Sequence, residues 1–488
     1  SMAATNTSGS DNNALGRQSL GALTSGARNQ AFGNLAIRFA DTENDNLGFG
    51  HHALGGSVAG GEYNVAVGNT TLDALTSGDN NVALGYSAGT EITTGGNNTL
   101  IGYQAGRDMT DDTDNVAVGF RAGSNLLESF NVILGSDSAR LATSLNDSII
   151  IGASAAGSGV ATGNANVVIG RTAGQNLTSA DSNILIGKEA GQALTTGGDN
   201  IFIGQDAGDD HDAETNNLGI GKGSLGGSIA GGEYNVAIGN TSLSQLTSGD
   251  KNTVVGFQAG KSISSGGTNV IIGHQAMDTA TTPANGVFIG NNVGGEATTT
   301  GNQNNIVGAE SGLALTSGAS NMVFGPYAFQ ANTTGSRNMV MGSDALRYPD
   351  TENDNIAIGH LALGGSGIAG GEFNIGIGSN TLDALTSADE NIAIGYRAGS
   401  ALTTGSSNVF IGANSAQTGV ITGANNIGIG PTTTQKLTSG ANNIGIGANA
   451  LQDTTTASNN TALGYTAGKD VTTGQAQVFI GSGAGASL

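Results

Sequence analysis

The sequence predicts an all-β protein, a parallel β-solenoid (β-roll) of about 28 coils with ~17 residues each. A five-residue frame occurs 28 times: Asn, an apolar residue, a small or apolar residue, an apolar residue and Gly. A fixed short period is typical of a solenoid, in which each unit buries its apolar side chains against its neighbours. A 17-residue unit is too short for a helix pair, and the 84 glycines suit a chain that turns often.

Each coil should contain two short strands and two corners. In the copy whose frame ends at Gly68, we expect a first strand over residues 65–67 and a corner at the glycine. A second strand then returns Leu72 and Leu75 to the interior, and residues 76–78 form the second corner. Glycine at both corners would permit the positive φ angles that tight turns require.

The first position of the frame is Asn in 25 of the 28 copies, the exceptions being Ser148, Gly286 and Gln477. A side-chain amide that recurs at the coil period can bond to the amides above and below it and to the backbone of the corner. We therefore expect a stack of asparagines in register.

The apolar positions of the frame suggest a strand that is buried on both faces. The last one, such as Val67, is apolar in every copy, so we expect it to line the interior. The middle position then faces outward by strand alternation. Because it is never polar, other copies of the chain, packed around a shared axis, should cover it. This prediction makes four phenylalanines accessible in a single chain and buried only in the assembly: Phe202, Phe288, Phe410 and Phe479.

The frame Asn-apolar-Ala-apolar-Gly, followed by Ala-Gly as in residues 81–89, resembles the head repeats of trimeric autotransporter adhesins. It is also similar to the repeat shafts of phage tail fibres and of the surface fibres of predatory bacteria. The resemblance implies a homotrimer with left-handed coils, forming a non-enzymatic fibre that extends from a cell or virion and mediates attachment. Its partners would be a host or prey glycan or protein. Adhesin heads usually have a shorter repeat, so the Leu-Thr-Thr-Gly corner should be larger here.

Residues 12–488 should form one continuous repeat domain, preceded by a disordered polar tail, residues 1–11, in which Ser1-Met2 looks like a cloning scar. We see no secretion signal, heptad stalk or apolar run of membrane-spanning length, so either such parts were cut away or the chain is assembled into a larger particle. A net charge of −22 opposes binding to nucleic acid and to anionic membranes. The absence of cysteine makes the fold independent of the redox compartment.

The sequence also contains a longer repeat, which spans several coils. Three acidic coils are each followed by a long coil that contains Gly-Gly-Glu and an aromatic residue, and the first and third blocks agree closely over about fifty residues. The extra length should bulge at the surface, where loops carry function. The candidate binding patches are Asp41, Glu43, Asp45, Glu62 and Tyr63; Asp212, Glu214, Glu233 and Tyr234; and Asp350, Glu352, Asp354, Glu372 and Phe373.

The sequence argues against an enzyme and predicts no cofactor, because its five histidines are scattered and no catalytic motif is present. The alternative function is a monomeric β-solenoid that binds calcium, ice or a glycan. Asp41, Glu43 and Asp45 alternate, so their carboxylates could share one side and hold calcium. Thr or Ser stands eight residues after the glycine in 18 of 27 copies, which could suggest ice binding. Aromatic residues such as Tyr86 and Tyr103 could stack on sugars or pack against neighbouring coils.

Overall fold

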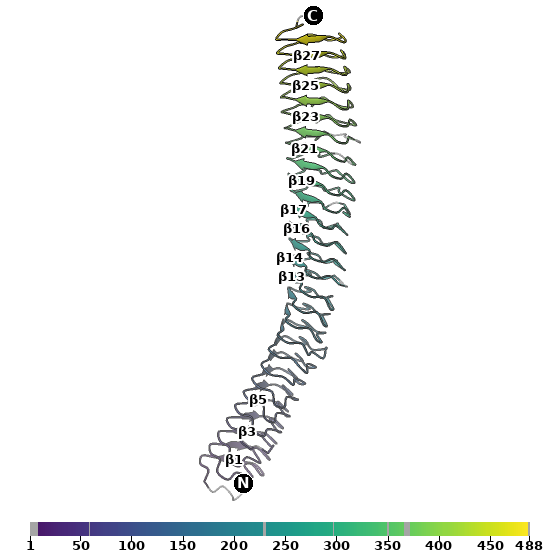
Figure 1. Ribbon diagram of the computed structural model, residues 1–488. Helices are drawn as coiled ribbons and strands as arrows, with labels where there is room; N and C mark the ends of the chain where they lie inside the picture. Colours follow the sequence, from purple (N-terminus) through teal and green to yellow (C-terminus); the bar gives the residue numbers. More distant parts are fainter. Residues whose placement is uncertain are drawn as a thin grey trace. The chain divides into compact units, whose positions relative to one another are not determined.

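The structure, a computed structural model, describes residues 8–57, 59–227, 231–295, 297–348, 351–365 and 371–486. The predicted parallel β-solenoid is confirmed, since these residues form 28 three-residue strands and no helix. Strands one coil apart pair in parallel and in register, as Val65 pairs with Val82. The chain divides into two compact units, one running to Thr241 with Gln245–Ser248 and the other comprising Ser242–Ser244 and Gly249 onward. Within each unit the strands lie one above the next (Figure 1).

The strands of the first unit are β1 (Asn13–Leu15), β2 (Gln30–Phe32), β3 (Leu47–Phe49), β4 (Val65–Val67), β5 (Val82–Leu84), β6 (Thr99–Ile101), β7 (Val116–Val118), β8 (Val132–Leu134), β9 (Ile149–Ile151), β10 (Val167–Ile169), β11 (Ile184–Ile186), β12 (Ile201–Ile203), β13 (Leu218–Ile220) and β14 (Val236–Ile238). Those of the second unit are β15 (Thr253–Val255), β16 (Val270–Ile272), β17 (Val287–Ile289), β18 (Asn305–Val307), β19 (Met322–Phe324), β20 (Met339–Met341), β21 (Ile356–Ile358), β22 (Ile375–Ile377), β23 (Ile392–Ile394), β24 (Val409–Ile411), β25 (Ile427–Ile429), β26 (Ile444–Ile446), β27 (Thr461–Leu463) and β28 (Val478–Ile480).

Our prediction of which side chains fill the interior is wrong. From β2 onward each strand buries its middle residue in the coil's own core, whereas its first and third residues remain half-buried or exposed. The reason is the frame asparagine: Asn64 is fully buried, and alternation places Ala66 on the same side while Val65 and Val67 face outward. The four phenylalanines that we expected between chains are therefore buried within a single chain: Phe202, Phe288, Phe410 and Phe479.

At some levels the interior is filled by a large and a small residue on successive coils. Phe202 in β12 pairs with Gly219 in β13, and Phe410 in β24 pairs with Gly428 in β25. A Cβ placed at Gly219 would lie 3.1 Å from the Phe202 ring. Leucines on the opposite side of the coil, such as Leu72, are buried as predicted. Close packing explains why the middle position varies so widely in size.

The opposite side of the coil is not the second strand that we predicted. Thr70 and Leu72 have φ angles of 55° and 49°. A left-handed residue other than glycine costs roughly 1–2 kcal/mol, and the same conformation recurs at equivalent positions such as Leu243. The backbone bonds to neighbouring coils instead: the Thr70 N–H donates to His51 (2.8 Å) and the Leu72 N–H to Ala88 (3.1 Å). The stack offsets the local strain, so this coil geometry depends on its neighbours.

The two corner glycines have different roles. Gly68 has a φ of 138°, as predicted for a corner. Gly78, at the second corner, does not have a positive φ, which contradicts our prediction for that position. A Cβ at Gly78 would instead lie 2.0 Å from the carbonyl oxygen of Gly95 in the next coil. Glycine suits this coil because its backbone approaches that of the next coil too closely for a side chain, whereas other coils hold residues such as Glu43 and Ala180 at the equivalent position.

The predicted asparagine stack is confirmed. The Asn64 Oδ1 accepts hydrogen bonds from the Asn81 N–H (2.9 Å) and the Asn81 Nδ2 (3.1 Å). The Asn81 Nδ2 also donates across its own coil to the Gly95 carbonyl (2.9 Å). Ser148 preserves part of the pattern, because its hydroxyl accepts from the Asn166 N–H (3.2 Å). Each amide thus joins two coils and fixes the width of one.

The burial of the middle strand residue, and the outward position of its two neighbours, lead to a stability prediction. Phe202→Ala should destabilise its coil by about 3–5 kcal/mol, because it leaves a cavity in a dry core. Ile203→Ala, on the outward side of the same strand, should cost much less in a dissociated chain. Hydrogen exchange measured by mass spectrometry on the dilute protein should show lost protection near Phe202 only in the first variant, confined to adjoining coils. Equal effects of the two substitutions would contradict the assignment of faces.

Candidate functional site

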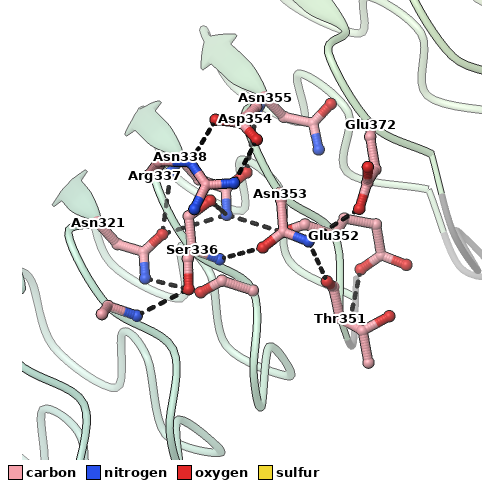
Figure 2. Close-up of polar contacts among 12 residues, drawn as sticks. Asn321, Ser336, Arg337, Asn338, Thr351, Glu352, Asn353, Asp354, Asn355 and Glu372 are labelled. Carbon is pink, nitrogen blue, oxygen red and sulfur yellow. Dashed lines mark hydrogen bonds and ion pairs between the residues drawn. The ribbon is translucent and has the colours of Figure 1, made fainter.

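The structure brings each acidic coil against the bulged coil that follows it. The Asn44 Nδ2 donates to Glu62 (2.6 Å) in the first block, and the Thr215 hydroxyl donates to Glu233 (3.3 Å) in the second. In the third block the Asn353 Nδ2 donates to Glu372 (2.8 Å), as Figure 2 shows. The acidic coils and the Gly-Gly-Glu coils therefore do form joint surface patches.

One glutamate in each acidic coil is a structural cap. Glu43, Glu214 and Glu352 are buried. The Glu43 carboxylate accepts from the N–H groups of Asp41 (2.5 Å) and Thr42 (3.0 Å), and from that of Gly60 (2.8 Å) in the next coil.

Glu214 accepts in the same way from Asp212 (2.9 Å), Ala213 (3.2 Å) and Gly231 (3.1 Å). In the third block the Thr351 N–H donates to Glu352 (2.9 Å). The inward carboxylate thus ties the acidic coil to the bulge by satisfying backbone donors.

The expectation that Asp41, Glu43 and Asp45 present their carboxylates on one side is wrong. Glu43 turns inward, and Asp41 accepts a hydrogen bond from the Thr24 hydroxyl. Asp45 forms a bidentate pair with Arg28, with N···O distances of 2.6 and 2.5 Å. Among the described residues, no group of three His, Cys, Asp or Glu side chains is placed to hold a metal ion. The described residues of these coils therefore provide no set of ligands for calcium.

Our prediction for the first acidic coil did not include Arg28, the ion-pair partner of Asp45. Arg337 pairs with Asp354 (2.7 Å) in the third block just as Arg28 pairs with Asp45 in the first (Figure 2). In both pairs the guanidinium hydrogen bond lowers the pKa of the aspartate below its usual value. The available signal was the 17-residue spacing of opposite charges, repeated in both copies of the block. Asp350 lies outside the described residues.

The second block differs in chemistry. Asn216 stands where the other blocks have the paired aspartate. His211 is buried against the Phe202 ring (4.7 Å between centroids), and burial lowers its pKa to about 3. Desolvation, reinforced by Asp210, raises the pKa of Asp209 to about 6. The three blocks therefore share a scaffold and do not repeat one binding surface.

Three of the aromatic residues stack on one another. The Tyr86 and Tyr103 rings stack at 5.5 Å, and Tyr103 stacks on Phe120 at 5.2 Å with interplanar angles of 12° and 14°. Arg121 covers Phe120 at 4.6 Å. Ring faces that neighbouring coils occupy are not open to a sugar, which supports the packing role. Tyr63, Tyr234 and Phe373 are more than half exposed, at 55%, 53% and 55%.

The threonine column is also engaged within the stack. The Thr76 hydroxyl donates to the Thr93 carbonyl (2.9 Å), and the Thr93 hydroxyl donates to the Thr110 carbonyl (3.1 Å). These hydroxyls stabilise the second corner from coil to coil.

A further candidate functional surface consists of strand positions that we predicted to face the interior. We call the first and third residues of the strands the outer strand face. The third residue is apolar in all 28 strands, and no charged residue occurs at either position. Six strands begin with a polar residue, namely Asn13, Gln30, Thr99, Thr253, Asn305 and Thr461. Large apolar side chains are exposed on this face, including Leu84, Ile272, Phe324, Met341 and Leu463.

A shallow groove of about 560 Å³ lies beside the first acidic coil. Phe39, Asp41, Ser57 and Gly60 are among its lining residues. Phe39 is partly exposed, and the Arg38 guanidinium lies 4.4 Å from its ring centre. The groove has one aromatic surface and several polar groups, most of which already bond to the protein.

No model of a known protein family matches the chain, and no curated protein does so either. The described part of the chain also holds no helix with the length and hydropathy needed to cross a membrane.

The buried glutamate can be tested directly. Glu43→Ala should raise the exchange rates of the Asp41, Thr42 and Gly60 amides roughly tenfold, because each loses a charged acceptor worth about 1–3 kcal/mol. Glu43→Gln should raise them less, since one oxygen acceptor remains. Glu91→Ala, which removes an exposed glutamate, serves as the control and should leave them unchanged. Unchanged protection in Glu43→Ala would refute the capping role.

Proposed function

We propose that the chain is a structural segment of an extracellular fibre, in which three copies pack their outer strand faces around a common axis. Such a fibre would hold a binding end away from a cell or virion and thereby support attachment. The outer strand face is the single observation that carries this proposal.

The face is larger than an isolated soluble protein normally exposes. Fourteen strands of three residues span roughly 650 Å² in each unit, from a strand spacing of ~4.8 Å and a rise of about 3.3 Å per residue. Contiguous apolar patches on monomers rarely exceed about 300–600 Å². Leaving this surface in water would be unfavourable.

A second copy of the chain is the partner that fits best. The face repeats at the coil period, so a complementary surface must repeat with the same spacing along its whole length. An identical chain meets that condition. The face also lacks charge, so copies that are each strongly acidic can meet there without direct repulsion. The number three comes from the resemblance of the frame to the repeats of trimeric adhesin heads.

A monomeric binding module is the second candidate function. The observation that favours it is the groove beside Phe39, where an aromatic side chain lies next to carboxylate and hydroxyl groups. A saccharide is the ligand that this combination suits. Under this alternative the outer strand face would remain in water.

The molar mass in solution separates the two candidates. Light scattering after size-exclusion chromatography should give three times the chain mass of 47.9 kDa. The double variant Ile377→Asp/Ile394→Asp places two charges on the outer strand face, and each buried unpaired charge costs several kcal/mol. It should elute as a single folded chain.

The matched control is Ser387→Asp/Thr404→Asp, which adds the same charge to the same two coils at exposed corner positions. This control should keep the wild-type mass. A wild-type mass of one chain would overturn the fibre proposal and leave the binding module.

A further inference from the structure

The outer strand face of the second unit is interrupted by one amide, at the fourth of its fourteen strands. Asn305 is the first residue of β18 and pairs in register with the first residues of the two adjacent strands, Val287 of β17 and Met322 of β19. The other outward residue of its strand is Val307. The side chain of Asn305 is half-buried. The amide of Asn305 therefore has apolar side chains above, below and beside it on this face.

The other polar interruptions differ in kind. Asn13 and Gln30 satisfy each other through an Nδ2···Oε1 hydrogen bond of 2.7 Å. Thr99, Thr253 and Thr461 are β-branched residues that suit a strand and carry one small hydroxyl each. Asn305, by contrast, brings two donors and an acceptor oxygen to an apolar surface, and no hydrogen bond of its side chain is found within the described part of the chain.

We infer that Asn305 sets the axial register between copies of the chain. This inference rests on the proposed function, in which the outer strand faces cover one another. Once the face is covered, an amide without a partner costs about 1–3 kcal/mol. In copies aligned side by side in register, every Asn305 lies at the same level, so the amides can bond to one another.

A shift by one coil removes that partner. The amide of one copy would then lie level with Val287 or Met322 of its neighbour, which have no hydrogen-bonding group to offer. The apolar positions of the repeated face discriminate poorly between registers, because a one-coil shift replaces one apolar residue with another. A single buried polar position that fixes register at a cost in stability is an established device in repetitive interfaces.

Moving the amide by one coil provides the test. The relocated variant, Val287→Asn/Asn305→Val, keeps the composition of the face and transfers the amide from β18 to β17. It should assemble with itself to the wild-type mass. When it is refolded with wild-type chains carrying a different affinity tag, mixed assemblies should fall at least tenfold below chance, because both levels then hold unmatched amides. Tandem affinity capture followed by native mass spectrometry measures the fraction of mixed assemblies.

The single variant Asn305→Val is the control, because it mismatches only one level. Its mixing with wild type should be impaired less than that of the relocated variant. Mixing of the relocated and wild-type chains in chance proportions would overturn the register role while leaving assembly intact. If light scattering gives the wild-type protein the mass of a single chain, the inference and the proposed function are both overturned. The same measurement therefore separates this outcome from chance mixing within intact assemblies.

Discussion

The inward position of the frame asparagine is the constraint on which this structure depends. A buried amide must be satisfied, and here it bonds to the asparagine of the adjacent coil and across its own coil to the second corner, as Asn81 does with Asn64 and Gly95. Since strand side chains alternate, this one position sends the middle residue of the frame into the core and both flanking residues outward. A shift of one residue would exchange the two faces completely.

Two consequences follow from that arrangement. The coil closes through left-handed residues such as Thr70 and Leu72, whose strain is tolerated because their N–H groups bond to neighbouring coils. The strand, in turn, exposes apolar residues that its own chain does not cover. The same geometry therefore makes each coil dependent on its neighbours and leaves each unit with an apolar surface that its own strands do not cover. The acidic blocks modify the corners of this scaffold without disturbing the stack.

The period of the sequence was enough to predict parallel strands in register, the asparagine stack and the meeting of each acidic coil with its bulge. It did not reveal which side of the strand faces inward, because Val65, Ala66 and Val67 are all apolar and hydropathy does not distinguish them. The recurring asparagine was the usable signal, since a polar residue at such a frequency needs a buried network. Glu43 looked like a surface carboxylate, yet it occupies the position where other coils have a tightly packed glycine. The Arg28 pairing depends on a contact between coils, which local sequence does not display.

The methionines of the chain offer the most direct measurement of whether the outer strand face is covered. Met322, Met339 and Met341 are exposed on that face in a single chain, at 41%, 37% and 42%, whereas Met109 and Met277 are fully buried in the core. Hydrogen peroxide converts accessible methionine to its sulfoxide, and peptide mass spectrometry measures the rate at each position. If copies of the chain cover the face, the three outer methionines of the native protein will oxidise as slowly as the two core methionines. Oxidation of the outer three at the rate of a free methionine would show that the face lies in water and would contradict this account.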